Sequence, residues 1–149
     1  MITFEQYIGG YDKKFPGEFT EIIRKNAVHT IDMSNWLLAE AQLDRSSNSG
    51  WRPRIINAAT PGAAKNSLHI TAQADDISDR DRQLAIWCVK NQNILEKFGL
   101  WMEDPRYTST WVHVQTVAPH SGNRIFIPTK ERPSVRELTF WEDAPLIKI

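Results

Sequence analysis

Apolar residues recur at helical spacing along residues 18–43. The spacing is that of one helical face, with recurrence after three or four residues: Phe19, Ile22, Ile23, Ala27, Ile31 and, later, Leu37, Leu38 and Ala41. The pattern predicts one long helix or two abutting helices. The preceding residues, 1–17, contain Gly9-Gly10 and Pro16-Gly17, and we expect them to form an irregular lead-in.

A second helical segment is predicted after residue 78. Ser78 can serve as the N-cap of a helix from Asp79, because acidic residues follow in the first turn. The apolar positions of this segment run over residues 84–89 and then include Ile94, Leu95 and Phe98. Gly99 is expected to end it, since glycine readily adopts the left-handed backbone conformation that follows many helices.

Three segments are predicted to be extended. Residues 67–77 are expected to be mostly extended, and residues 111–117 and 124–127 are apolar or alternate between apolar and polar positions, as strands do. Prolines and polar residues predict loops between the helices and these strands. The expected fold is therefore α+β, with helices packed on a small antiparallel sheet.

The length and composition of the chain indicate one domain. With 149 residues, of which 41% are hydrophobic and 24% charged, the chain is expected to form a single domain over residues 1–149. Residues 128–149 contain Pro133 and Pro145 and are expected to form an extended tail. Cys88 is the only cysteine and lies in an apolar stretch. It is interpreted as a buried thiol, with a reactive nucleophile as the minor alternative.

Charge and hydropathy argue against two classes of partner. The formal net charge is zero, so broad electrostatic attraction to nucleic acid is not expected. No apolar run approaches the roughly 20 residues that span a bilayer, so a membrane partner is not expected either. The first residues lack the basic start and apolar stretch of a secretory signal, and we expect synthesis in the cytoplasm without a signal peptide.

His69, Asp76 and His113 are the residues that most strongly indicate chemistry. Two imidazoles and one carboxylate can occupy three corners of a tetrahedral zinc site and leave the fourth open for water, which is typical of a catalytic site. A structural zinc site normally uses four protein ligands, often thiolates, and this chain has one cysteine. The other two histidines, His29 and His120, have no motif around them.

Three short segments together resemble one family of zinc enzymes. In chain order they are Ser49-Gly50-Trp51-Arg52-Pro53, the stretch from Ser67 and His69 through Ala74 to Asp76, and Trp111-Val112-His113. Their order and residues are similar to those of the D-Ala-D-Ala metallopeptidases. That family includes zinc D,D-carboxypeptidases, the vancomycin-resistance D,D-dipeptidase and phage L-alanyl-D-glutamate endolysins, and it shares a fold with the zinc domain of hedgehog.

The resemblance implies that Zn²⁺ is bound by His69, Asp76 and His113. The family pattern has Ala two residues before the ligand carboxylate, which selects Asp76 and leaves Asp75 as a carboxylate behind the ligands or at the surface. The resemblance also implies that Arg52 stabilises the oxyanion that forms during hydrolysis, a role suited to a fixed guanidinium.

Two further residues are candidates for substrate binding. Ser67 can hydrogen-bond the substrate or a metal ligand, although a strand hydroxyl without a role is an equal alternative. Trp51 is a candidate wall of a peptide cleft, although large aromatic residues are first of all core material.

The general base is absent from the positions where the family carries it. Many relatives have Glu or Asp three residues before the last His ligand, where this chain has Thr110, and others have Asp two residues after it, where this chain has Gln115. Neither side chain accepts a proton from water at neutral pH. Three alternatives remain: Glu103, or next Asp104, serves as the base; Gln115 only orients the water in a slow enzyme; or the domain binds without cleaving.

Two hypotheses for the function follow. The leading one is a zinc metallopeptidase that hydrolyses peptide bonds in peptidoglycan stem peptides, of D,D- or L,D-type. Such a protein would be a phage lysis or virion-associated protein that acts at the bacterial cell wall or within a phage particle. The alternative is a non-catalytic, peptidase-like binding or structural module of a phage particle, with or without zinc, and with virion proteins as partners.

Overall fold

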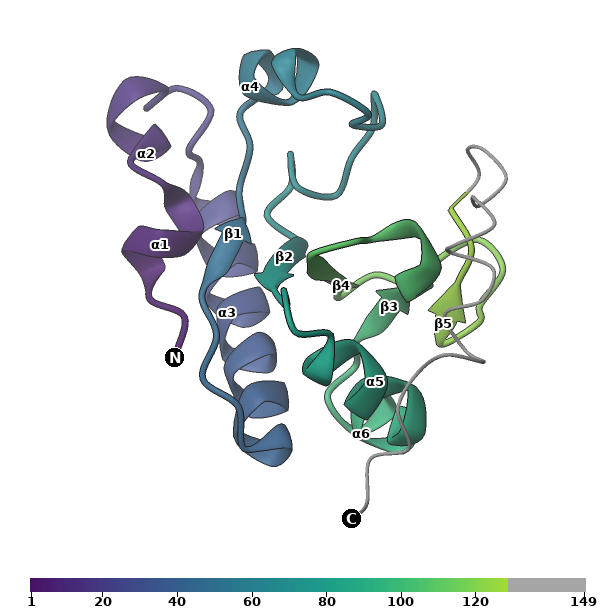
Figure 1. Cartoon of the computed structure of the whole chain (residues 1–149). Coiled ribbons are helices and arrows are strands. Elements are labelled where there is room, and N and C mark those ends of the chain that lie inside the picture. Colours follow the sequence, from purple (N-terminus) through teal and green to yellow (C-terminus); the bar gives the residue numbers. More distant parts are fainter. Residues whose placement is uncertain (129–149) are drawn as a thin grey trace.

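The computed structural model of the chain describes residues 1–128, so the expected tail over residues 128–149 lies almost wholly outside the described residues. Figure 1 shows a mixed α+β architecture in which helices pack against a small sheet. Within residues 1–128 the sheet contains five strands, in the order β1-β2-β4-β3-β5. Their bounds are β1 Ser47–Ser49, β2 Ala74–Ser78, β3 Trp101–Glu103, β4 Trp111–Gln115 and β5 Ile125–Phe126.

The expectation of an antiparallel sheet is wrong for its last strand. The pairs β1–β2, β2–β4 and β3–β4 are antiparallel, whereas β5 runs parallel to β3. Both edges of β4 are already paired, with β2 and with β3. The chain that returns after β4 therefore pairs with the free edge of β3, and because it runs opposite to β4 it is parallel to β3.

The long helix expected from the apolar spacing is a single helix, α3 (Glu21–Ala41). At its start the Thr20 side chain accepts a hydrogen bond from the backbone N–H of Ile23. At its end Gln42 adopts a left-handed backbone conformation, and its N–H donates to the carbonyl oxygens of Leu38 and Ala39. Its buried face includes Ile23, Ala27, Ile31, Leu37 and Leu38.

Helices cover one face of the sheet and leave the other face for the polar cluster described below. On the sheet, α3 contacts β2, α5 (Gln83–Lys90) contacts β4, and α6 (Gln92–Lys97) contacts β3. The strand residues in this core are Ile77, Met102, Val112 and Val114. Because successive strand residues point to opposite faces, the residues between them, such as His113, point away from the helices.

Cys88 lies on α5 in this core and has no exposed surface. Burial raises the pKa of its thiol well above the ordinary value, which disfavours the reactive thiolate. The interpretation of Cys88 as a buried thiol is therefore confirmed.

The expectation of an irregular lead-in over residues 1–17 is wrong. This segment forms two short helices, α1 (Phe4–Ile8) and α2 (Tyr11–Lys14). Thr3 and Gln6 cap the start of α1 reciprocally, each through its side chain and the other's backbone N–H. Gly9 and Gly10 both have positive φ, so the glycine pair marks the junction between two helices rather than an irregular stretch.

The expectation of an extended segment over residues 67–77 is correct only for its second half. Residues 67–73 form turns, held by backbone hydrogen bonds such as those from Ala72 to His69 and from Gln73 to Leu68, and β2 begins at Ala74. Ala72 has a φ of 57°, and the chain changes direction there. The other elements in the described part of the chain are α4 (Arg54–Ala59) and the short 3-10 helix η1 (Pro105–Tyr107).

Ser78 does not cap the following helix, contrary to expectation. It is the last residue of β2 and pairs with Trp111, and α5 begins five residues later. The cap is supplied instead by Asp79, whose fully buried carboxylate accepts hydrogen bonds from the backbone N–H groups of Leu84 (3.0 Å) and Ala85 (2.9 Å). Among residues 1–128, no helix combines the length and apolar character needed to cross a bilayer.

Replacing Asp79 with alanine is expected to lower the free energy of unfolding by about 1–2 kcal/mol, because two backbone N–H groups at the start of α5 lose their acceptor. Asp79→Asn keeps one acceptor oxygen and is expected to lose less. Urea denaturation measures both changes. Asp32→Ala, an exposed position on α3, is the control, and an equal loss in Asp32→Ala and Asp79→Ala would contradict the capping role.

Candidate metal centre

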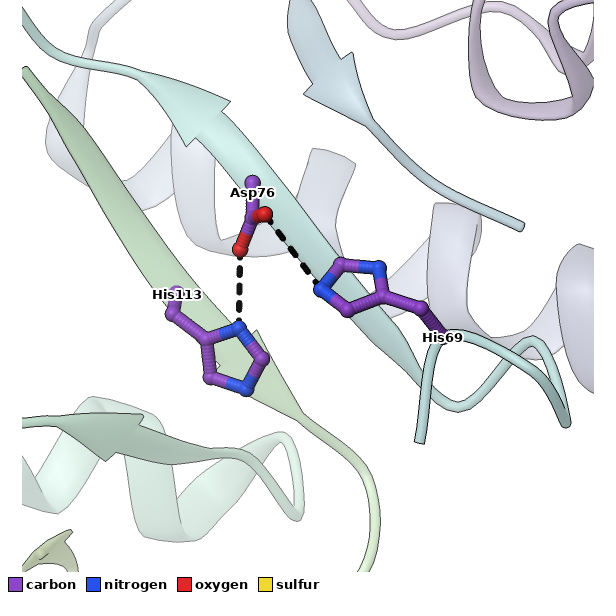
Figure 2. A group of neighbouring side chains, drawn as sticks. All are labelled: His69, Asp76 and His113. Carbon is purple, nitrogen blue, oxygen red and sulfur yellow. Dashed lines mark hydrogen bonds and ion pairs between the residues drawn. The ribbon is translucent and has the colours of Figure 1, made fainter. Parts of the chain in front are cut away.

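His69, Asp76 and His113 form one cluster on the face of the sheet opposite the helices. Figure 2 shows the Asp76 carboxylate between the two imidazole rings. Asp76 Oδ1 lies 2.8 Å from His113 Nδ1, and Asp76 Oδ2 lies 3.3 Å from His69 Nε2. One donor atom from each residue lies within 4.8 Å of the other two, so the cluster can hold a metal ion.

The strand pairing brings two of these residues together. Asp76 and His113 are directly opposite each other in the antiparallel pair β2–β4, and their side chains therefore point to the same face. His69 comes from the turn before β2, and this turn carries its ring over Asp76 (Figure 2). Asp76 follows His69 by seven positions in the chain, whereas His113 is brought to the site by the pairing of β4 with β2.

His69 is held in the orientation that a metal ligand needs. Its Nδ1 lies 2.7 Å from the backbone carbonyl oxygen of Gly50, an acceptor, so Nδ1 carries the hydrogen and donates it. The Nε2 lone pair is then free and faces Asp76. Burial lowers the pKa of His69, which keeps the imidazole neutral and able to bind a metal.

The charges of the cluster favour an ionised Asp76. Burial opposes ionisation of this carboxyl, but His69 and His113 together outweigh it and hold the Asp76 pKa well below its usual range. Burial likewise opposes a charge on His113, but Asp76, with smaller contributions from Glu103 and Gln115, outweighs it and raises the His113 pKa. Without a metal, His113 and Arg52 both stabilise the negative charge of Asp76.

The segment Ser49–Arg52 supports two of the candidate ligands. Gly50 accepts the hydrogen bond from His69, and the Arg52 backbone N–H donates to the His69 carbonyl oxygen at 3.0 Å. The Arg52 guanidinium donates to Ser49 Oγ at 2.7 Å and to Asp76 Oδ2 at 2.8 Å. The structure therefore places the Arg52 side chain beside the candidate ligands, with a direct bond to Asp76.

Gly50 is required by a close backbone contact. A Cβ atom at position 50 would lie 2.3 Å from the backbone oxygen of Tyr7 on α1. The neighbouring backbone N–H of Trp51 donates to that same oxygen at 3.0 Å. Helix α1, which the sequence pattern did not predict, therefore directly contacts the segment that orients His69.

The structure places Trp51 and Asp75 in the interior. Trp51 is 2% exposed, packs against Phe19 with ring centroids 5.0 Å apart, and donates from Nε1 to the Ile70 carbonyl oxygen. Asp75 has no exposed surface and accepts a hydrogen bond from Ser47, so a position at the surface is wrong for it. Burial raises the pKa of Asp75 to about 7.

Ser67 and the remaining histidines lie outside the metal cluster. The Ser67 hydroxyl accepts a hydrogen bond from the His69 backbone N–H at 3.2 Å, so within the described residues it contacts the turn that carries a ligand. His29 and His120 are exposed and do not belong to the cluster. These positions agree with the absence of a motif around them.

Glu103 lies near the cluster, whereas Asp104 is occupied elsewhere. Met102 on β3 pairs with Val114 and points into the core, so Glu103 points to the same face as His113. Burial raises the pKa of Glu103, and the opposing charge of His113 and the like charge of Asp76 also act on it. The Asp104 carboxylate instead caps η1 and forms an ion pair with Arg106.

The Gln115 side chain contacts Nε2 of His113, the ring nitrogen that points away from Asp76. Its Oε1 lies 3.3 Å from His113 Nε2, and its Nε2 donates to the Val117 carbonyl oxygen at 2.7 Å. No spacing rule predicts this pair of bonds, because they depend on the rotamers of both side chains.

The donor set and its supporting bonds fit a divalent metal ion. Two imidazole nitrogens and a carboxylate oxygen converge, and each side chain has a second hydrogen-bond partner behind it, as is usual for metal ligands. Comparison of the chain with models of protein families, with curated proteins and with solved structures found no match. The geometry of His69, Asp76 and His113 is therefore what defines the site.

The purified protein is expected to hold about one divalent metal ion per chain, with two nitrogens and one oxygen as protein ligands. His113→Ala is expected to lose the metal, because the two remaining ligands cannot complete the site. Elemental analysis after dialysis measures the content. His29→Ala removes an exposed histidine and should retain the metal; full retention by His113→Ala would contradict the assignment.

Proposed function

We propose that this chain is a zinc-dependent peptidase that hydrolyses peptide bonds in peptidoglycan stem peptides. The observation that carries the proposal is the convergence of His69, Asp76 and His113 on the face of the sheet opposite the helices, with Glu103 on the same face. The resemblance of the sequence segments to the D-Ala-D-Ala metallopeptidases supports the substrate class. It also supports a role in phage lysis or in a virion, at the bacterial cell wall or within a phage particle.

Zinc is the proposed metal because two imidazoles and one carboxylate suit it, and three protein ligands leave one position open. Bound there, zinc would lower the pKa of a coordinated water and polarise the scissile carbonyl. The protein groups then need to orient the peptide, remove a proton from the attacking water and compensate the charge on the carbonyl oxygen.

Glu103 is the proposed general base. It lies on β3 next to the strand that carries His113, and its pKa is raised mainly by burial. A raised carboxyl pKa brings a base closer to the operating pH and improves proton transfer. Asp104, the other candidate base, is less suitable because its carboxylate already pairs with Arg106 and caps η1.

Arg52 is the proposed oxyanion-stabilising residue. Two of its nitrogens are held by Ser49 and Asp76, so the guanidinium is fixed beside the metal ligands before substrate arrives. A preorganised positive charge stabilises a developing negative charge without reorganisation during the reaction. A hollow of about 270 Å³ lined by Arg52, Ser49, Asn48 and Tyr7 lies next to it and is a candidate position for part of the peptide.

A non-catalytic module of a phage particle is the second candidate function. Thr110 and Gln115 occupy the positions where the D-Ala-D-Ala metallopeptidases that the chain resembles carry the base, and the Gln115 side chain is hydrogen-bonded to His113 and Val117. A domain that keeps the ligands but cannot deprotonate water would bind a peptide or a virion protein without cleaving it. Digestion of purified peptidoglycan by the zinc-loaded protein, with mass analysis of the fragments, separates the two functions.

Glu103→Gln is expected to lower the rate of peptidoglycan hydrolysis by roughly 10²- to 10⁴-fold, because the amide cannot accept a proton. Zinc content should stay unchanged, since Glu103 is not a ligand. Glu96→Gln on the exposed face of α6 is the matched control and should keep wild-type activity. An active wild type that is insensitive to Glu103→Gln would show that another group is the base.

Arg52→Lys is expected to lower turnover by roughly 10²-fold at saturating zinc, because an ammonium cannot contact Ser49, Asp76 and the oxyanion in one fixed geometry. Saturating zinc separates this effect from any weakening of metal affinity through Asp76. Arg54→Lys, at an exposed position on α4, is the control. If turnover at saturating zinc is unchanged, Arg52 only orients Asp76.

A further inference from the structure

Gln115 is a buried amide that none of the proposed steps of hydrolysis uses. It is the last residue of β4 and is 7% exposed. Its backbone is paired on both sides, with Ala74 on β2 and with Trp101 on β3. The position of its Cα is therefore fixed by two neighbouring strands, and its side chain lies on the same face as His113, two residues earlier.

The hydrogen bonds of Gln115 give its amide a defined direction. The NH₂ group can only donate and the oxygen can only accept. Because Nε2 donates to the Val117 carbonyl oxygen at 2.7 Å, Oε1 is the atom that faces His113 Nε2, at 3.3 Å. An acceptor at this position requires that His113 Nε2 carries a hydrogen.

This requirement determines which nitrogen of His113 is free for a metal. Without a metal, both nitrogens of His113 face an acceptor, Asp76 on one side and Gln115 on the other, and both can carry a hydrogen. A metal-bound imidazole is neutral and carries one hydrogen, so a hydrogen held on Nε2 by Gln115 leaves Nδ1 as the nitrogen that would bind the metal. Nδ1 is the nitrogen that lies 2.8 Å from Asp76 and points into the cluster (Figure 2). His69 shows the complementary arrangement, because the Gly50 carbonyl holds its Nδ1 hydrogen and frees Nε2.

We propose that Gln115 is a positioning residue that sets the tautomer and ring orientation of His113, so that Nδ1 is presented to the metal. The inference rests on the metal centre of the proposed function, but not on catalysis. Glutamine suits the task because it both accepts from His113 and donates to Val117. A carboxylate at position 115 would accept from His113 but would lose the bond to Val117, and an apolar residue would lose both.

The proposal is tested by measuring the zinc affinity of each variant by competition with a chromophoric chelator. The temperature is one at which circular dichroism shows that each variant is folded. Gln115→Leu is expected to bind zinc about 10- to 100-fold more weakly, the usual cost of removing a group that orients a metal ligand. Gln115→Glu keeps an acceptor for His113 Nε2 and should restore most of the affinity. This order, with Glu close to Gln and Leu weakest, is specific to an acceptor role.

Asn57→Leu is the matched control for loss of a buried amide. Asn57 is 4% exposed, and its Nδ2 donates to the Ala64 carbonyl oxygen at 2.9 Å, as Gln115 does to Val117. If Gln115 were only a structural residue, Gln115→Leu and Asn57→Leu would both lower the melting temperature and both leave zinc affinity unchanged. That result would overturn the proposal.

Nitrogen-15 NMR of the imidazole rings in zinc-loaded wild type gives a readout that needs no variant. The expected spectrum has the hydrogen of His113 on Nε2 and the metal on Nδ1; the reverse assignment overturns the proposal.

The same measurements distinguish failure of the proposed peptidase function from failure of the role proposed for Gln115. A wild type that binds no zinc removes the metal centre and this inference together. A wild type that binds zinc but leaves peptidoglycan intact removes the peptidase alone, while the affinity order of the variants still decides the role of Gln115.

Discussion

The pairing of Asp76 with His113 across β2 and β4 is the constraint on which the site depends. The two residues are directly opposite each other, so one carboxylate oxygen reaches an imidazole nitrogen at 2.8 Å. A slip of β2 by one residue would turn Asp76 into the helix layer and bring Asp75 to the face opposite the helices. Ile77 opposes this slip, because the slip would move it out of the core that it shares with Val112 and Val114 of β4.

A connected series of hydrogen bonds and close contacts, from α1 to β4, holds the candidate ligands in place. Tyr7 on α1 fixes the backbone at Gly50 and Trp51, and Gly50 fixes His69. Arg52 then fixes Asp76 from the same segment. On the other side, a side-chain amide rather than the backbone contacts His113. Residues far apart in the sequence thus hold three side chains so that one donor atom of each lies within 4.8 Å of the other two, close enough to hold a metal ion.

Local patterns in the sequence were sufficient to predict those features of the protein that depend on residues close together in the chain. The spacing of Ile23, Ala27 and Ile31 predicted α3, because a helix places every third or fourth residue on one face. The residue types and spacing of the motif segments selected His69, Asp76 and His113, which the structure brings together. The α+β class followed from the same local patterns. The expectation that Arg52 lies near the metal came from the resemblance, since nothing local to Arg52 indicates its neighbours.

What the sequence by itself determined was therefore the main helix, the class of fold and the identity of the candidate ligands. Only the tertiary structure decided that Asp79 rather than Ser78 caps α5, that β5 runs parallel to β3, and that Gln115 bonds His113. Each of these depends on where a distant segment lies and on the direction of a side chain. A hydrogen bond requires donor and acceptor within about 3 Å and well aligned, a condition that sequence spacing does not specify for residues brought together by folding.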